Sequence, residues 1–428
     1  MYRYMQQVQI HIKDKKSTIS FSAMGLFFIL LITIAEIYEA GLLSGWYLTA
    51  VFISVIIAFL GYAVYIERQN YNIYTSSNDY NVYIAPVLII SVQWIIYAVY
   101  NIFLYAIGIG NIQYMKSSCI QELIPFVILI GAGASCFVFR KNTLKYIQYT
   151  IWLNYFLVFV KWIFFNGPEK TFEGILSIFS GLSVSNPFET YSGINYVIGI
   201  LVIYYLNINN SYKIYKLKYI PFLMTLVFLN GKRSVYLAVG LLFIYYIFSF
   251  KTKDRTKYKI QIFISVLMIL AYLFYVYLIN SNIFSDFAFK GKINFMGRAH
   301  MWLYIAQYID FTPAFLGKGF SFATLTLEKN RVWSYNNNVY SMHGEILAMY
   351  TDLGFLIFVF WMSYNLLIIC RIFKNKYGYK ISNIYWSLTM YLFILYLTER
   401  ATNIFILQTV YIVLIIQSIQ LEYRRMIK

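Results

Sequence analysis

The chain has 428 residues, of which 60% are hydrophobic and 12% charged, and its mean hydropathy is +0.62. A soluble protein of this length would expose far more charge. These values therefore exclude a soluble protein and predict an integral membrane protein. The net charge of +18 comes from Lys and Arg spread over short segments between apolar runs. That spread argues against a nucleic-acid-binding surface, so nucleic acid is not an expected partner.

Continuous apolar runs, instead of an alternation with period two, predict helices that cross the membrane. Polar breaks divide the chain into about 12 such runs, so we expect an all-α polytopic membrane protein with about 12 transmembrane helices. We expect residues 1–428 to form a single integral membrane domain. The expected spans are 20–38, 43–66, 83–107, 121–139, 145–165, 188–206, 217–230, 234–250, 260–280, 346–370, 383–398 and 403–420.

The Lys and Arg residues between the spans predict their orientation. A cytoplasmic N-terminus places the strongest cationic clusters on the inner side, and an even number of spans returns the C-terminus to the same side. We therefore expect a multi-pass protein with both termini cytoplasmic. The expected inner segments are 1–19, 67–82, 140–144, 207–216, 251–259, 371–382 and 421–428.

Residues 281–345 form one long polar stretch between two late spans, and the same orientation places it outside the cytoplasm. Within this stretch, apolar residues at near-helical spacing over 298–310 predict a helix at the membrane surface or packed on the bundle. Pro313 and Gly317 then break the pattern, and 323–338 is polar and rich in asparagine. We expect one large extracytoplasmic loop that carries a surface helix.

Cationic residues at the outer ends of spans are candidate phosphate ligands. Arg298 begins the predicted surface helix, where free backbone N–H groups and a guanidinium together suit a phosphate. Lys232 and Arg233 occupy a turn between two short spans, against the positive-inside trend. An arginine that only reaches lipid headgroups, or an ordinary hairpin tip, explains the same patterns.

His343 lies where the long loop returns to the membrane, and Glu345 follows two residues later. A histidine with a near-neutral pKa at the membrane surface suits a general base, although a lone interfacial histidine is more often a satisfied polar residue. His300 is two residues from Arg298, so we expect it to face elsewhere on the helix.

Glu399 and Arg400 follow the eleventh predicted span at its outer end. They could line the same cavity or form a structural ion pair. The three histidines are too few and too scattered for a zinc site, and no paired aspartates indicate a metal-bound nucleotide sugar. We expect neither a metal nor a cofactor.

Three stretches in the second half of the chain carry ordered motifs: LNGKRSVYLAVGLL (229–242), MGRAHMWLYIAQYIDFTPAFLGKGFSF (296–322) and MHGEILAMYTDLGFLIFVF (342–360). Together with one large late outer loop, they resemble the O-antigen and capsular polysaccharide polymerase (Wzy) and O-antigen ligase superfamily of bacterial membrane glycosyltransferases. The matching positions are Arg233, Arg298, Trp302, Gly317, Gly319, His343, Leu347, Asp352 and Gly354. The departures are Gly344 where the family often has Asn, Asp352 where Glu is commoner, and Lys232 where Ser or Thr is frequent.

This resemblance implies metal-independent glycosyl transfer at the outer face of the bacterial cytoplasmic (inner) membrane. The donor would be an oligosaccharide linked to undecaprenyl pyrophosphate, and the acceptor another lipid-linked repeat unit. His343 would take the acceptor proton, with Glu345 or Glu399 as the alternative base, while Arg233 and Arg298 neutralise the departing pyrophosphate. The expected substrate-binding residues are Lys232, Arg331, His300, Glu345 and Arg400.

Two other functions fit parts of the pattern. An O-antigen ligase uses the same chemistry with a lipid A-core acceptor, and sequence separates it poorly from a polymerase. A polysaccharide or lipid flippase also has about twelve spans, but it tends to have two similar halves and short loops. Since this chain has no internal repeat and one long outer loop, we favour a polymerase working among membrane lipids beside a flippase and a chain-length regulator.

Overall fold

The computed structural model describes residues 80–110, 112–177, 192–212, 219–229, 231–281, 283–284, 298–330 and 342–427. Within these ranges every regular element is helical and no strand occurs. The main helices are α5 (Ala85–Ala106), α6 (Ile112–Phe139), α7 (Thr143–Ser177), α8 (Ser192–Tyr212), α9 (Ile220–Leu229), α10 (Arg233–Ser249), α11 (Asp254–Asn280), α13 (Arg298–Ala306), α14 (Phe322–Lys329), α15 (Glu345–Ser363), α16 (Ile369–Tyr377), α17 (Tyr379–Tyr396) and α18 (Phe405–Ile427). Short segments η1 (Tyr80–Ile84), η2 (Arg140–Asn142), η5 (Tyr364–Ile368) and η6 (Ala401–Asn403) join or extend them.

The helices confirm an all-α polytopic membrane protein. Among the described residues, 5 helices are long and apolar enough to cross a membrane. They are Asn81–Ala106, Thr143–Leu176, Asp254–Asn280, Glu345–Tyr377 and Phe405–Tyr423. Each span predicted from residue 83 onward coincides with a helix, several of them shorter, whereas the predicted spans 20–38 and 43–66 lie outside the described residues. The total of twelve therefore stays a prediction.

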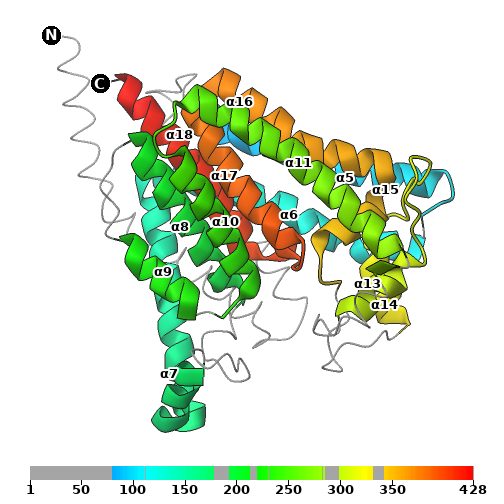
Figure 1. The fold of residues 1–428 in the computed structure, drawn as a ribbon, viewed down its shortest axis with the longest axis horizontal. Coiled ribbons are helices and arrows are strands. Elements are labelled where there is room, and N and C mark those ends of the chain that lie inside the picture. The colour runs from blue at the N-terminus through cyan, green and yellow to red at the C-terminus, as the bar shows by residue number, and fades with distance from the viewer. Residues whose placement is uncertain are drawn as a thin grey trace.

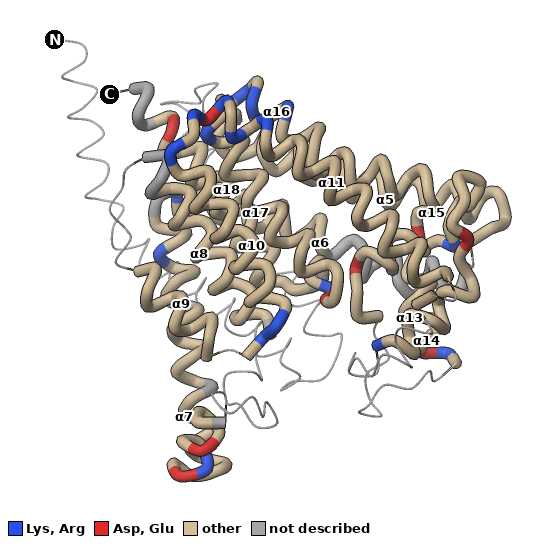
Figure 2. Tube along the Cα trace, in the orientation of Figure 1, with Lys and Arg blue, Asp and Glu red and all other residues tan. Residues whose placement is uncertain are grey.

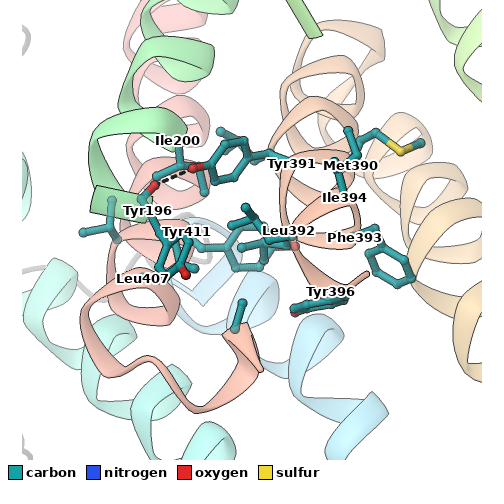
Figure 3. Close-up of a cluster of buried hydrophobic side chains, with 14 of the residues drawn as sticks. Tyr196, Ile200, Met390, Tyr391, Leu392, Phe393, Ile394, Tyr396, Leu407 and Tyr411 are labelled. Carbon is teal, nitrogen blue, oxygen red and sulfur yellow. Dashed lines mark hydrogen bonds between the residues drawn. The ribbon is translucent and has the colours of Figure 1, made fainter. Parts of the chain in front are cut away.

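α17 and α18 form the centre of the bundle (Figure 1). In the apolar window of α18, 89% of residues are buried, against 28% in α11, so α11 presents most of its surface outward and α18 almost none. Figure 3 shows part of this core, where the Tyr391 hydroxyl donates a 2.8 Å hydrogen bond to the Tyr196 carbonyl. A Cβ at Gly199 would come within 2.8 Å of Cζ of Tyr391, so glycine permits this close approach of α8 to α17.

Cationic residues gather at one end of the bundle, around the start of α11 and the end of α16 (Figure 2). The Lys374 ammonium lies 5.4 Å from the centre of the Tyr258 ring, and the Asn383 side chain donates a 3.3 Å hydrogen bond to the Asp254 carbonyl. These contacts bring the predicted inner segments 251–259 and 371–382 together. The chain order then places the start of α10, the end of α17 and the beginning of α15 at the opposite end.

The long loop packs on that opposite end and contains two short helices, α13 and α14 (Figure 1). α13 ends at Ala306, short of the predicted 310, and buries Trp302 and Ile305, so of the two predicted positions it has the one packed on the bundle. The first part of the polar stretch 323–338, for which the sequence predicted no helix, is helical, because α14 occupies Phe322–Lys329. The first N–H groups of α14 donate to the side chain of Asp352, which is distant in sequence, so the local sequence does not reveal this acceptor.

The loop is joined to α15 at a kink. Gly354 has a φ of 69° and interrupts the helix, and the N–H of Phe355 bonds to the Phe315 carbonyl at 2.9 Å instead of continuing the ladder. The Thr351 carbonyl accepts the N–H of Lys318 at 2.8 Å. A Cβ on Gly317 would lie 2.6 Å from the Gly354 nitrogen, so the two motif glycines are where the two backbones meet.

Candidate functional site

The Glu399 carboxylate lies at the centre of a polar cluster where α17 gives way to α18. The Arg298 guanidinium lies 3.5 Å from its Oε1, and Nδ1 of His343 lies 4.0 Å from its Oε2. The Ser234 hydroxyl donates to Oε1 at 3.4 Å, and the Tyr196 hydroxyl also hydrogen-bonds with this carboxylate. Side chains from α8, α10, α13 and the segment before α15 therefore converge on one acid.

The position of His343 is fixed by its backbone. The Trp302 indole N–H donates a 2.6 Å hydrogen bond to the His343 carbonyl. Gly344 follows with a φ of 118°, and a Cβ there would lie 3.3 Å from the Leu397 carbonyl and 3.4 Å from the Trp302 nitrogen. The N–H of Glu345 bonds to the Glu399 carbonyl at 3.3 Å, which ties the start of α15 to the end of α17. Glycine at 344 thus lets the imidazole approach Glu399.

The surroundings of His343 favour the neutral imidazole. Burial lowers its pKa below the ordinary value, and the nearby charges of Arg298 and Lys232 lower it further. Glu399 acts in the opposite direction and raises the pKa, but the net shift is downward. A histidine with a lowered pKa is largely unprotonated at neutral pH, so this side chain is able to accept a proton.

Two more cations stand at the start of α10, beside the cluster. Lys232 is half-buried at the N-cap, and its carbonyl accepts the N–H groups of Val235 and Tyr236 at 3.1 Å. Arg233 is exposed as the first residue of the helix. The N-terminus of a helix carries partial positive charge, so cations there add to a field that attracts anions.

Arg400 is half-buried next to Glu399 and is held by the loop. Its Nη1 donates a 2.8 Å hydrogen bond to the Thr324 hydroxyl, and its Nη2 lies 3.5 Å from the Ser321 hydroxyl. Its guanidinium is therefore oriented by α14, whereas Arg298 is oriented by Glu399. The two arginines approach the same connection from different parts of the loop.

Other candidates from the sequence have separate surroundings. Glu345 is 3% exposed, and its carboxylate accepts a 2.6 Å hydrogen bond from the Thr402 hydroxyl, so it anchors the connection between α17 and α18. His300 is exposed on α13, and Arg331 lies outside the described residues. Within the described ranges no three His, Cys, Asp or Glu side chains are grouped as metal ligands.

Sequence reasoning underestimated Glu399 and missed Ser234 and Tyr196. The available signal for Glu399 was an acidic residue at the outer end of a span, beside Arg400, which fits a structural ion pair equally well. Ser234 follows the Lys-Arg turn, and Tyr196 is one of 44 tyrosines, so neither is distinctive by residue type. Only the folded chain brings these three residues together.

The fold and this cluster define a class: a polytopic α-helical membrane protein with a cationic, histidine-bearing site at one end of its bundle. Residues 219–362 match the family model described as O-antigen ligase, and that segment contains Arg233, Arg298 and His343. The match supports the similarity to the O-antigen polymerase and ligase superfamily that the motifs predict. Members of this family are membrane enzymes of the glycosyltransferase kind that act on lipid-linked polysaccharides. No curated protein and no solved structure matches the chain.

Proposed function

We propose that the protein is a polysaccharide polymerase. It transfers a glycan from undecaprenyl pyrophosphate onto another lipid-linked repeat unit at the outer face of the bacterial cytoplasmic membrane. The observation that carries this proposal is the His343 imidazole, kept neutral by its surroundings and placed beside the Arg298 guanidinium by Glu399. A neutral base next to a fixed cation suits a reaction that releases an acceptor proton and a pyrophosphate anion together.

In the proposed step, the acceptor hydroxyl oxygen forms a bond to the anomeric carbon of the donor sugar. The bond from that carbon to the pyrophosphate oxygen breaks, and its electron pair leaves with the pyrophosphate. The hydroxyl proton passes to His343, and Glu399 stabilises the imidazolium that results, since its carboxylate is 4.0 Å away. General-base catalysis of this kind is worth about 10²–10⁴ in rate.

Arginines supply the charge that the leaving group needs, so the proposed reaction requires no metal. Arg298 and Arg233 neutralise the pyrophosphate, with Lys232 and Arg400 as further contacts and Arg331 and His300 as proposed glycan or phosphate contacts. A hydrogen bond to a charged group contributes about 1.5–3 kcal/mol. Glu345 supports this site indirectly, because its carboxylate accepts a hydrogen bond from Thr402 in the connection between α17 and α18.

The proposed orientation follows from the separation of charges along the bundle. Segments 251–259 and 371–382 lie at the end opposite the Glu399 cluster, and positive-inside statistics favour a cytoplasmic position for them. Both termini are then cytoplasmic, and 281–345 is extracytoplasmic. The substrates reach the site in the outer leaflet, where a flippase would deliver them and a chain-length regulator would act on the product.

Reconstitution separates the candidate functions. The purified full-length protein, in lipid nanodiscs with chelator, is given lipid-linked repeat units alone. A polymerase yields a ladder of longer lipid-linked glycans together with free undecaprenyl pyrophosphate. A ligase makes a product only after lipid A-core is added, and a flippase forms no new bond with either. Absence of a ladder from the wild-type protein, with product appearing on lipid A-core, would overturn the polymerase proposal in favour of the ligase.

A further inference from the structure

Asp352 is a buried acid in α15 that the proposed reaction does not use. It is 3% exposed, and its carboxylate accepts a 2.7 Å hydrogen bond from the Tyr97 hydroxyl. The same carboxylate accepts the backbone N–H groups of Ser321 and Phe322, each at 3.1 Å. A carboxylate that satisfies three donors at once is strongly fixed, and it fixes the groups that donate to it.

The two backbone donors begin α14, so Asp352 caps that helix from another element. The first N–H groups of a helix have no acceptor within the helix, and a negative charge there is also favoured by the helix dipole. Ser321 enters the helix with a φ of 48°, a left-handed conformation unusual for a side-chain-bearing residue. The Asp352 side chain provides the hydrogen bonds that this conformation needs.

The end of α14 that Asp352 holds is also the end that binds Arg400. Ser321 presents its N–H to Asp352 and its hydroxyl toward Arg400. Thr324, one turn further along, accepts the shorter hydrogen bond from Arg400. A shift of the α14 N-terminus would therefore move both oxygens that orient the guanidinium.

We propose that Asp352 is a positioning residue that acts through α14 to hold the Arg400 guanidinium toward the lipid-linked pyrophosphate. The connection from Asp352 to Arg400 stands on the contacts above, and the identity of the anion rests on the proposed function. The positioned cation binds the substrate before the reaction as well as during it. Loss of the connection therefore raises KM more than it lowers kcat.

The test is a double-mutant cycle between Asp352→Asn and Thr324→Val in the full-length protein in nanodiscs. Asn keeps the shape of the side chain but offers one acceptor oxygen to three donors. We expect each single variant to raise KM for the lipid-linked repeat unit about tenfold. The double variant should also raise KM about tenfold, instead of a hundredfold, because both substitutions break the same connection. Asp352→Glu keeps both carboxylate oxygens and should recover most of the loss.

A matched control is Glu328→Gln, which neutralises an exposed carboxylate at the other end of α14 and should leave KM unchanged. A purely structural role for Asp352 would reduce the amount of active protein, and hence the apparent kcat, without changing KM. A hundredfold rise in KM in the double variant, or an unchanged KM in Asp352→Asn, would overturn the positioning role. If Asp352→Asn does not accumulate, Tyr97→Phe removes one donor and enters the same cycle.

Hydrogen exchange provides a readout that does not depend on activity. In Asp352→Asn, the amides of 321–329 should exchange faster than in the wild type, while those of α17 keep their protection. Faster exchange with an unchanged KM contradicts the positioning role and leaves the proposed function intact. A wild type without transferase activity contradicts the proposed function, while the exchange result still decides whether Asp352 holds α14.

Discussion

At the scale of single residues, the proposed reaction should have an acidic limit set by the balance of charge around His343. Arg298 lowers the pKa of this histidine, whereas Glu399 raises it. The histidine must be neutral to accept a proton, so the rate should fall as the pH drops through its pKa. Any variant that changes either neighbouring charge should therefore shift this limb in a direction fixed by the sign of the removed charge.

Glu399→Gln and Arg298→Ala should shift the acidic limb in opposite directions. Removing the carboxylate lowers the pKa of His343 further and moves the limb to lower pH, while removing the guanidinium raises the pKa and moves the limb to higher pH. The measurement is the pH dependence of kcat/KM for each variant beside the wild type. Shifts of the same sign, or a His343→Gln enzyme that keeps the full rate and the same limb, would rule out His343 as the base.

The exposed Arg233 should behave differently from Arg298. Arg233→Ala should lower polymerisation about 10- to 100-fold through loss of a charged contact to the leaving group, without moving the acidic limb. Arg233→Lys should restore little if the arginine binds phosphate through two nitrogens. The assay is polymer length and rate at matched levels of folded protein. If Arg233→Ala makes long polymer at the normal rate, Arg233 does not contribute to the site.

The candidate site was partly predictable at this scale. The motifs identified Arg298 and His343, and the structure places both beside Glu399. Glu399 was undervalued because an acid at a span end has the same local pattern whether it organises a site or only pairs with its neighbour. Its role depends on side chains far away in sequence, and no local periodicity reports such contacts.

At the scale of elements, the join between the loop and α15 depends on two glycines. Gly354→Ala places a side chain at a φ of 69°, and the new Cβ would lie 2.5 Å from the Gly317 nitrogen. We expect a destabilisation of about 1–3 kcal/mol or more, with loss of activity, because the interlocked backbones have to separate. Gly240→Ala in α10 is the control, since nothing lies within 4 Å of its Cβ position. Equal thermal stability of the two variants would contradict the interlock.

Helix positions were predictable because long apolar runs in lipid have few alternatives to a helix. α14 was not predicted, because its first N–H groups bond to Asp352 on another helix, and a helix of 8 residues is too short to show a clear apolar periodicity. The helix that contains the predicted span 145–165 also extends beyond the predicted end of that span. Gly167, with a φ of 77°, kinks α7, and the helix resumes as far as Ser177.

At the scale of the whole molecule, the charge separation along the bundle predicts its orientation. In a background with Cys119 replaced by Ser, a cysteine at Glu328 should react with a membrane-impermeant maleimide added outside intact cells. A cysteine at Arg255 should react only after the membrane is opened. Both native positions are exposed, and the remaining cysteines, Cys136 and Cys370, are buried. The reverse labelling pattern would invert the topology and place the site on the wrong side for the proposed reaction.

The acid at the centre of the cluster belongs to the last helical hairpin, between α17 and α18, whereas Ser234 and Arg298 precede it by many residues. During synthesis, the segments that carry Ser234 and Arg298 leave the ribosome well before Glu399 does. A nascent or truncated chain that lacks this hairpin therefore has no group to organise Arg298 and His343. Under the proposed function, a chain in which this hairpin has not yet inserted has no assembled site with which to act on its lipid-linked substrate.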